Sequence, residues 1–186
     1  MALPTTPLPP LTLLLGGARS GKSAHGEALV LASGLRPVYV ATAQALDAEM
    51  AERIRRHREG RGAGWLTVEE PLCLPETLAE HARADRAVLV DCLTLWLTNL
   101  MVAGRDPAEA SDRLLATLAA PAGPVVLVSN EVGFGVVPLD PMSRAFVDHA
   151  GRLHQRIGAV ADRVRFLAAG LPLDLKAPAV QAPCTS

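Results

Sequence analysis

The stretch LTLLLGGARSGKSAHGEALV, Leu11 to Val30, decides the fold of this chain. An apolar run over Leu11–Leu15 leads into the pattern G-x-x-x-x-G-K-[ST] at Gly16–Ser23, and a helical pattern follows over Lys22–Ala32. Strand, loop and helix in this order form the setting in which the pattern binds phosphate. The alternative is a chance glycine-rich turn, and the three matching parts argue against it. We therefore predict a site for a nucleoside triphosphate.

Each residue type in this loop suits a bound phosphate. Gly17 and Gly21 relieve steric limits, so that backbone N–H groups can turn toward an anion. Lys22 brings a positive charge to the β- and γ-phosphates, and the Ser23 hydroxyl can ligate Mg²⁺. The helix that follows adds the positive end of its dipole. The predicted nucleotide-binding residues of the loop are Gly16, Gly17, Ala18, Arg19, Ser20, Gly21, Lys22 and Ser23.

Apolar runs and helical patterns alternate along the rest of the chain. Further strands are expected at Val38–Ala41, Trp65–Val68, Ala87–Val90, Val125–Ser129, Val164–Ala168 and Leu173–Lys176. Further helices are expected at Ala45–Glu59, Leu74–Arg83, Leu93–Ala103, Pro107–Ala119 and Pro141–Val160. Runs such as AVLV and VVLV are apolar at every position, as in strands buried on both faces. This pattern predicts an α/β P-loop NTPase with a mostly parallel central sheet flanked by helices. Residues 11–176 form its single domain, and residues 1–10 and 177–186 are expected to be loose tails.

The composition excludes several classes of protein. A net charge of −1 and an aromatic content of 3% give no support to nucleic-acid binding. The first ten residues lack the charged head of a signal peptide, and the apolar run that follows is too short to span a bilayer. The three cysteines have no C-x-x-C spacing, which argues against a disulfide framework or a zinc site. We expect a cytoplasmic protein without an integral membrane segment.

A second phosphate-site residue is expected at Asp91. It ends the apolar run AVLVD, and a buried strand next to a phosphate loop commonly ends in an acid that binds Mg²⁺ directly or through water. The alternative role is an N-cap for the helix starting at Leu93, and the two roles are compatible. The predicted metal ligands are therefore Ser23 and Asp91.

The expected helix Ala45–Glu59 carries a histidine among many arginines. His57 shares a helix face with Glu49 and Arg53, and further arginines lie close to it in sequence: Arg55, Arg56, Arg58 and Arg61. One interpretation is a solvated charged face with an incidental histidine. The other is that His57 acts as a nucleophile toward a nucleotide phosphate, with the arginines neutralising the anionic centre. The spacing alone leaves both open.

Six stretches carry a resemblance to a known family: GGARSGKS, YVATAQALDAEMAERIRRHREGRGAGWLTVEE, VLVDCLTLWLTNLM, LVSNEVGFGVVP, RAFVDHAGRLHQRIGAVAD and the ending AAGLPLDLK. The pattern E-R-I-x-x-H-R in the second stretch, together with SNEVG and the ending, makes the match specific. With them, residues 11–176 resemble the bifunctional adenosylcobinamide kinase / adenosylcobinamide-phosphate guanylyltransferase family of cobalamin biosynthesis. The resemblance implies a RecA-like fold and a homotrimer. It implies phosphorylation of adenosylcobinamide by ATP or GTP, with Mg²⁺. A transfer of GMP from GTP to adenosylcobinamide phosphate follows, through a guanylyl-histidine.

The resemblance also assigns roles to residues by their position in the motifs. His57 would be the guanylylated histidine and, with Lys22, a catalytic residue. The further nucleotide-binding positions that it implies are Ala41, Thr42, Ala43, Arg58, Glu59, Gly60, Arg61, Glu69 and Asp91. Two positions depart from the family: Arg56 stands where some relatives have a second histidine, and His154-Gln155 stands where Asn-Gln is common.

Three alternatives remain open at this stage. Glu131, in SNEVG, could act as a base toward the cobinamide hydroxyl or assist Mg²⁺, or it could belong to a structural turn. The chain could be a P-loop kinase for another small alcohol, without transferase activity. It could also be a nucleotide-gated binding module without turnover.

Overall fold

The computed structural model describes residues 7–44, 52, 55, 59, 62 and 64–177. In these residues one sheet runs in the order β3-β2-β4-β5-β1-β6-β7. Its strands are β1 (Leu11–Gly16), β2 (Arg36–Ala41), β3 (Leu66–Glu69), β4 (Arg86–Asp91), β5 (Val125–Asn130), β6 (Arg163–Ala168) and β7 (Leu171–Lys176). All neighbouring pairs are parallel except β6 and β7, which are antiparallel. The predicted α/β fold with a mostly parallel sheet is confirmed.

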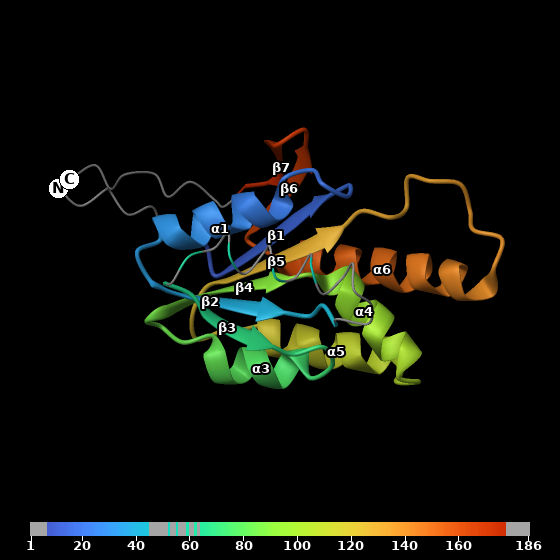
Figure 1. The fold of residues 1–186 in the computed structure, drawn as a ribbon, viewed down its shortest axis with the longest axis horizontal. Coiled ribbons are helices and arrows are strands. Elements are labelled where there is room, and N and C mark those ends of the chain that lie inside the picture. Colours follow the sequence, from blue (N-terminus) through green and yellow to red (C-terminus); the bar gives the residue numbers. More distant parts are fainter. Residues whose placement is uncertain are drawn as a thin grey trace.

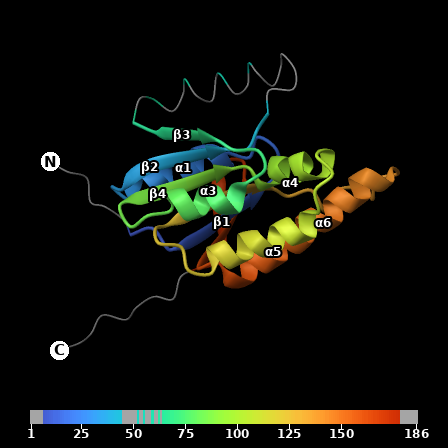
Figure 2. The same cartoon turned by 90° about the horizontal axis from the view of Figure 1, so that it is seen from below.

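Helices cover both faces of the sheet (Figure 1). Their bounds are α1 (Lys22–Ala32), α3 (Leu74–His81), α4 (Leu93–Val102), α5 (Pro107–Leu118) and α6 (Pro141–Val160). Helix α1 packs on β1, β4 and β5 from one face, and α3, α4, α5 and α6 lie on the other (Figure 1). The view from below shows α5 and α6 side by side (Figure 2), and these two helices are in contact. Among the described residues, no helix combines the length and the apolar character that crossing a membrane requires.

The core lies on both faces of the sheet, which explains why the central strands are apolar at every position. Leu89 and Val126 pack with Val30 of α1 in one buried cluster. Val90 and Leu127 belong to a larger cluster on the opposite face, under α3 to α6. A strand that alternates its side chains between two dry layers needs apolar residues throughout.

Two elements differ from the sequence prediction or lie partly outside the described residues. The last strand begins at Leu171 rather than at the predicted Leu173, because the turn at Ala169 and Gly170, both at positive φ, returns the chain directly onto β6. The predicted helix Ala45–Glu59 lies largely outside the described residues; Glu52, Arg55 and Glu59 are helical.

Candidate functional site

The carboxyl ends of the parallel strands bring the predicted site residues to one edge of the sheet. Ala41 at the end of β2 pairs with Glu69 of β3 on one side and with Asp91 of β4 on the other. Gly16 at the end of β1 pairs with Asn130 of β5 and with Leu167 of β6. Open α/β sheets bind their ligands at this edge. The edge therefore joins the phosphate loop to the predicted acid, although Glu69 lies exposed at its outer end.

The phosphate loop, residues 16–23, links β1 to α1 in a tight turn. The Ser20 N–H donates to the Gly17 carbonyl (3.3 Å), and the first hydrogen bond of α1 runs from the His25 N–H to the Gly21 carbonyl (2.9 Å). No side chain caps the start of α1. The first-turn N–H groups of this helix are thus left for an anion, as its dipole favours.

The steric need for glycine falls on Gly16 and Gly21. A Cβ at Gly16, where φ is 151°, would lie 2.3 Å from the Leu167 carbonyl oxygen. Gly21 has a φ of 95°, a backbone conformation that favours glycine. The atoms nearest to a Cβ at these two glycines belong to Leu167 of β6 and to Gly170 of the turn after it. A Cβ at Gly17 would meet no protein atom within 4 Å, so the predicted role of Gly17 beside a bound phosphate stays a prediction.

Lys22 is the catalytic cation predicted for this loop, and the structure places it inside the turn. Its side chain is 5% exposed. Its Nζ donates to the Gly17 carbonyl oxygen at 2.6 Å and lies 3.3 Å from Ser20 Oγ. Burial lowers the pKa of Lys22, and the nearby Cys92 and Asp91 oppose that shift. The ammonium group is thus held at the loop, where a nucleotide's phosphates would lie.

Asp91, the predicted metal ligand, is held by a side chain that the motif does not contain. The Tyr39 hydroxyl donates to Asp91 Oδ2 over 3.0 Å. Tyr39 is buried in β2, and its aromatic ring meets Trp65 edge-on. Tyr39 pairs with Leu89, and Asp91 is two residues further along β4, so both side chains point toward the α1 face. The hydroxyl therefore fixes one carboxylate oxygen on the side of the phosphate loop.

A buried network lies behind Asp91 and orders the ends of β2 and β4. The Thr42 hydroxyl donates to the Cys92 carbonyl, and the Cys92 N–H donates to Thr42 Oγ1, both at 2.8 Å. Asn99 of α4 donates from Nδ2 to the carbonyls of Thr42 (2.7 Å) and Pro71 (3.1 Å). Burial raises the pKa of the Cys92 thiol, and Asp91 adds to that shift. Thr42 is fully buried and its hydroxyl supports this edge of the sheet. Its predicted contact with the nucleotide stays a prediction.

The end of β5 carries a second polar cluster. Ser129 Oγ and His154 Nε2 are 2.7 Å apart, and His154 Nδ1 lies 3.9 Å from Glu131 Oε2. Burial lowers the pKa of His154, and Glu131 opposes the shift. The Glu131 N–H donates to the Gly16 carbonyl (3.0 Å), and its Oε1 accepts from the Gly133 N–H (2.6 Å). Glu131 is thus part of a turn and also adjoins the phosphate loop, so both of its predicted roles remain compatible with the structure.

Several predicted site residues cannot be placed. His57, Arg58, Gly60 and Arg61 lie outside the described residues, as does Arg56. Glu59 is described: it is exposed and forms an ion pair with Arg55 Nη1 at 2.5 Å. The assignment of His57 as the nucleophile therefore stays a prediction.

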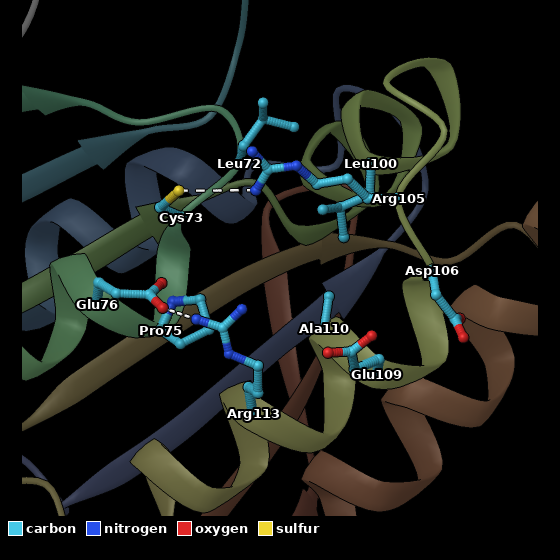
Figure 3. A pocket seen from close by; sticks show the side chains of 10 residues that line it. All are labelled: Leu72, Cys73, Pro75, Glu76, Leu100, Arg105, Asp106, Glu109, Ala110 and Arg113. Carbon is cyan, nitrogen blue, oxygen red and sulfur yellow. Dashed lines mark hydrogen bonds and ion pairs between the residues drawn. The ribbon is translucent and has the colours of Figure 1, made fainter.

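A pocket of about 200 Å³ lies away from the phosphate loop, where α3 meets the start of α5 (Figure 3). Arg105 lies with Nη1 3.7 Å from the Cys73 sulfur, and Arg113 forms an ion pair with Glu76. No residue of the phosphate loop lines this pocket. Its cations are already in contact with side chains of the chain itself, so we do not assign the nucleotide to it.

The donor atoms at the carboxyl edge fit Mg²⁺ held together with a nucleotide. No group of three or more His, Cys, Asp or Glu able to hold a metal occurs in the part of the chain that the structure describes. Ser23, at the start of α1, and Asp91 supply oxygen atoms, the ligand type that Mg²⁺ prefers. Mg²⁺ in nucleotide sites takes one or two protein oxygens and completes its shell with phosphates and water. A pair of ligands is sufficient for that arrangement.

The acid Asp91 ends β4, which β5 separates from β1, and not the strand adjacent to β1 as the sequence predicts. The sheet, the phosphate loop and this acid define a P-loop NTPase of the RecA-like α/β type. Solved structures share this fold. The flagellar accessory protein FlaH from Methanocaldococcus jannaschii matches with a TM-score of 0.52 and 13% identity, over 92% of this chain and 80% of that one. An ATPase from the type III secretion system of pathogenic bacteria matches with a TM-score of 0.52 and 11% identity, over 90% of this chain and 57% of that one. Identities this low show the fold alone.

Sequence comparison identifies the family. The model of the cobinamide kinase / cobinamide phosphate guanyltransferase family matches residues 12–175, and the chain belongs to this family. The bifunctional adenosylcobalamin biosynthesis protein CobP of Pseudomonas aeruginosa is 54% identical over 88% of this chain and 96% of its own length. The bifunctional adenosylcobalamin biosynthesis protein CobU of Salmonella typhimurium is 40% identical over 89% and 99%. The predicted family membership is confirmed.

Proposed function

We propose that this enzyme phosphorylates adenosylcobinamide with ATP or GTP and then transfers GMP from GTP to the phosphate it has made. The products of the second reaction are adenosylcobinamide-GDP and pyrophosphate. The observation that carries the proposal is the phosphate loop with Lys22 at the carboxyl edge, in a chain of the cobinamide kinase / cobinamide phosphate guanyltransferase family. The bifunctional names of CobP and CobU support the two activities.

In the kinase reaction, the substrate hydroxyl oxygen attacks the γ-phosphorus and the nucleoside diphosphate leaves. Lys22 and the N–H groups at the start of α1 neutralise the charge on the phosphates. Ser23 and Asp91 would hold Mg²⁺, which supplies further charge neutralisation when bound. Glu131, next to the loop, is the candidate base that accepts the hydroxyl proton.

In the transferase reaction, a nitrogen of His57 attacks the α-phosphorus of GTP and pyrophosphate leaves. A phosphate oxygen of adenosylcobinamide phosphate then attacks the guanylyl phosphorus and releases His57. The neighbouring arginines would neutralise the negative charge around the phosphorus that is attacked in both steps. Arg58, Glu59, Gly60 and Arg61 would contact GTP.

The resemblance to the family also suggests how the enzyme assembles and where it is located. We expect a homotrimer in the cytoplasm, where ATP and GTP are available. Cys73 and Cys92 are free thiols, which agrees with a reducing compartment. Light scattering on the purified protein measures the number of subunits directly.

The experiment that tests the proposal is incubation with GTP labelled at the α-phosphate. We expect a protein-bound label that is labile in acid and stable in alkali, mapping to His57. The variant His57→Ala should lose this label and GMP transfer while keeping part of the phosphorylation of cobinamide. His149→Ala, which removes another imidazole, is the matched control and should keep both.

Each alternative predicts a different result. A kinase without transferase activity would phosphorylate cobinamide and never carry the α-label. A nucleotide-gated binding module would bind nucleotide and yield no phosphorylated cobinamide in a mass-spectrometric assay. Either result in the wild-type protein rejects the proposed pair of reactions.

A further inference from the structure

The loop between β5 and α6 presents apolar side chains to the outside. We call residues 132–139 the apolar loop. Phe134, Val136, Val137 and Leu139 are between 72% and 97% exposed. Exposed apolar side chains that are contiguous usually mark a binding surface, because water around them is unfavourable. The loop extends from the carboxyl edge of the sheet beyond the start of α6 (Figure 1).

This loop is fixed at both ends. At its start, the Glu131 N–H donates to the Gly16 carbonyl at 3.0 Å, so the loop leaves the sheet directly beside the phosphate loop. At its end, Arg144 of α6 donates from Nη1 to the carbonyls of Pro138 (3.0 Å) and Leu139 (2.5 Å). A cavity of about 220 Å³ lies between the loop and α6. The apolar side chains therefore lie on an anchored backbone with a hollow behind it.

The apolar surface continues toward the other side of the phosphate loop. The rings of Phe134 and Phe166 are 5.9 Å apart, which joins the apolar loop to β6. Phe166 pairs with the exposed Leu173 of β7. The turn between β6 and β7 is itself bound to the phosphate loop, because the Gly170 N–H donates to the Ser20 carbonyl at 3.0 Å. Apolar side chains thus lie near the polar phosphate site on the β5 side and on the β6 side.

We propose that the apolar loop is the surface on which the corrin macrocycle of cobinamide lies during phosphoryl transfer. The inference rests on the proposed function. That substrate joins a reactive hydroxyl, on a short arm, to a broad macrocycle whose methyl-bearing rim offers apolar contact area. The hydroxyl must reach the γ-phosphate beside Lys22, so the macrocycle must lie within one arm's length of the phosphate loop. The apolar loop supplies an apolar surface attached to that edge by a backbone hydrogen bond.

The test compares two double variants, each of which replaces one exposed valine and one exposed leucine by serine. Val136→Ser with Leu139→Ser removes two exposed apolar side chains from the apolar loop. Leu31→Ser with Val160→Ser removes two exposed apolar side chains from the last residues of α1 and α6, which precede the strands β2 and β6 at the opposite edge. All four side chains are exposed, so both variants should fold. The readouts are KM for cobinamide, KM for ATP and the molar mass by light scattering.

We expect the loop variant to raise KM for cobinamide about tenfold, which corresponds to about 1.4 kcal/mol. KM for ATP and the molar mass should stay unchanged, and the control variant should match the wild type in all three. An unchanged KM for cobinamide overturns the inference. A loop variant with a lower molar mass also overturns it, because the surface would then be an interface between copies of this chain. If the wild-type protein does not phosphorylate cobinamide at all, the proposed function fails first.

Discussion

The loops after β1 and β5 leave the sheet side by side, yet they are built in opposite ways. The phosphate loop turns tightly, with Lys22 bound to the Gly17 carbonyl and to Ser20, and leaves the first N–H groups of α1 without a side-chain cap. The loop after β5 is longer and turns apolar side chains such as Val136 and Leu139 outward. The phosphate loop presents a charged group, and the loop after β5 presents apolar side chains. The proposed reaction needs this contrast, because the nucleotide is anionic and the acceptor carries a large macrocycle.

The largest effect should come from the cation of the phosphate loop. Lys22→Ala removes the charge that meets the β- and γ-phosphates, and we expect phosphorylation of cobinamide to fall at least about a hundredfold. Lys176→Ala, which removes the only other lysine in the chain, should keep the wild-type rate. A rate assay at saturating cobinamide measures both. A Lys22→Ala protein with wild-type turnover would refute the role given to this loop.

The buried network behind Asp91 should matter for stability, in contrast to the apolar loop. Asn99→Ala leaves the carbonyls of Thr42 and Pro71 without their donor, and we expect a loss of about 2–3 kcal/mol in the free energy of unfolding. Val136→Ser changes an exposed side chain and should leave that free energy within about 0.5 kcal/mol of the wild type. Urea denaturation followed by circular dichroism gives both values. Equal stability of the two variants would remove the contrast between the two regions.

A smaller effect is expected at Tyr39. Tyr39→Phe keeps the ring and removes the hydroxyl that donates to Asp91 Oδ2, a bond that contributes about 1 kcal/mol. Because Asp91 would then be less well oriented, kcat for phosphorylation should fall about threefold to tenfold. The Mg²⁺ concentration that gives half the maximal rate should rise. A variant with an unchanged Mg²⁺ dependence would mean that the hydroxyl serves packing alone.

The smallest effect concerns pH. Burial lowers the pKa of His154, so the folded protein keeps this imidazole neutral while the unfolded chain takes up a proton below about pH 6.5. The wild-type protein should therefore lose stability as the pH falls below that value. The variant His154→Asn should lose less stability over the same pH range. His25, whose pKa is also lowered by burial, still contributes to the loss in both proteins. Thermal unfolding at pH 7.5 and pH 5.5 measures the difference, and parallel curves for the two proteins would contradict this assignment.

The sequence predicts the parts of the site that are local in the chain. Strand, spacing and helix around Gly16–Ser23 are contiguous, and Asp91 ends a recognisably buried strand, so both could be found without a structure. The hydrogen bond of Tyr39 to Asp91 joins residues 52 positions apart, and that of Asn99 to Thr42 joins residues 57 apart. Such bonds depend on the strand order, which a pattern of alternating elements does not specify.

The apolar loop escaped prediction for a different physical reason. Its composition, VGFGVVPL, is the same whether the side chains are buried or exposed, and only their position beyond the end of β5 separates the two cases. Gly16 matches the motif, but the motif does not show why glycine is needed there. Its need for glycine comes from the carbonyl of Leu167 on β6, a neighbour that the motif does not contain.

We expect the phosphate loop to serve phosphoryl transfer to cobinamide and not hydrolysis or nucleotide sensing. The most direct measurement is a single turnover with ATP labelled at the γ-phosphate, Mg²⁺ and adenosylcobinamide. The label should move to the corrinoid in the wild-type protein and stay on ATP with Lys22→Ala. Label released only as free phosphate, with none on the corrinoid, would contradict it.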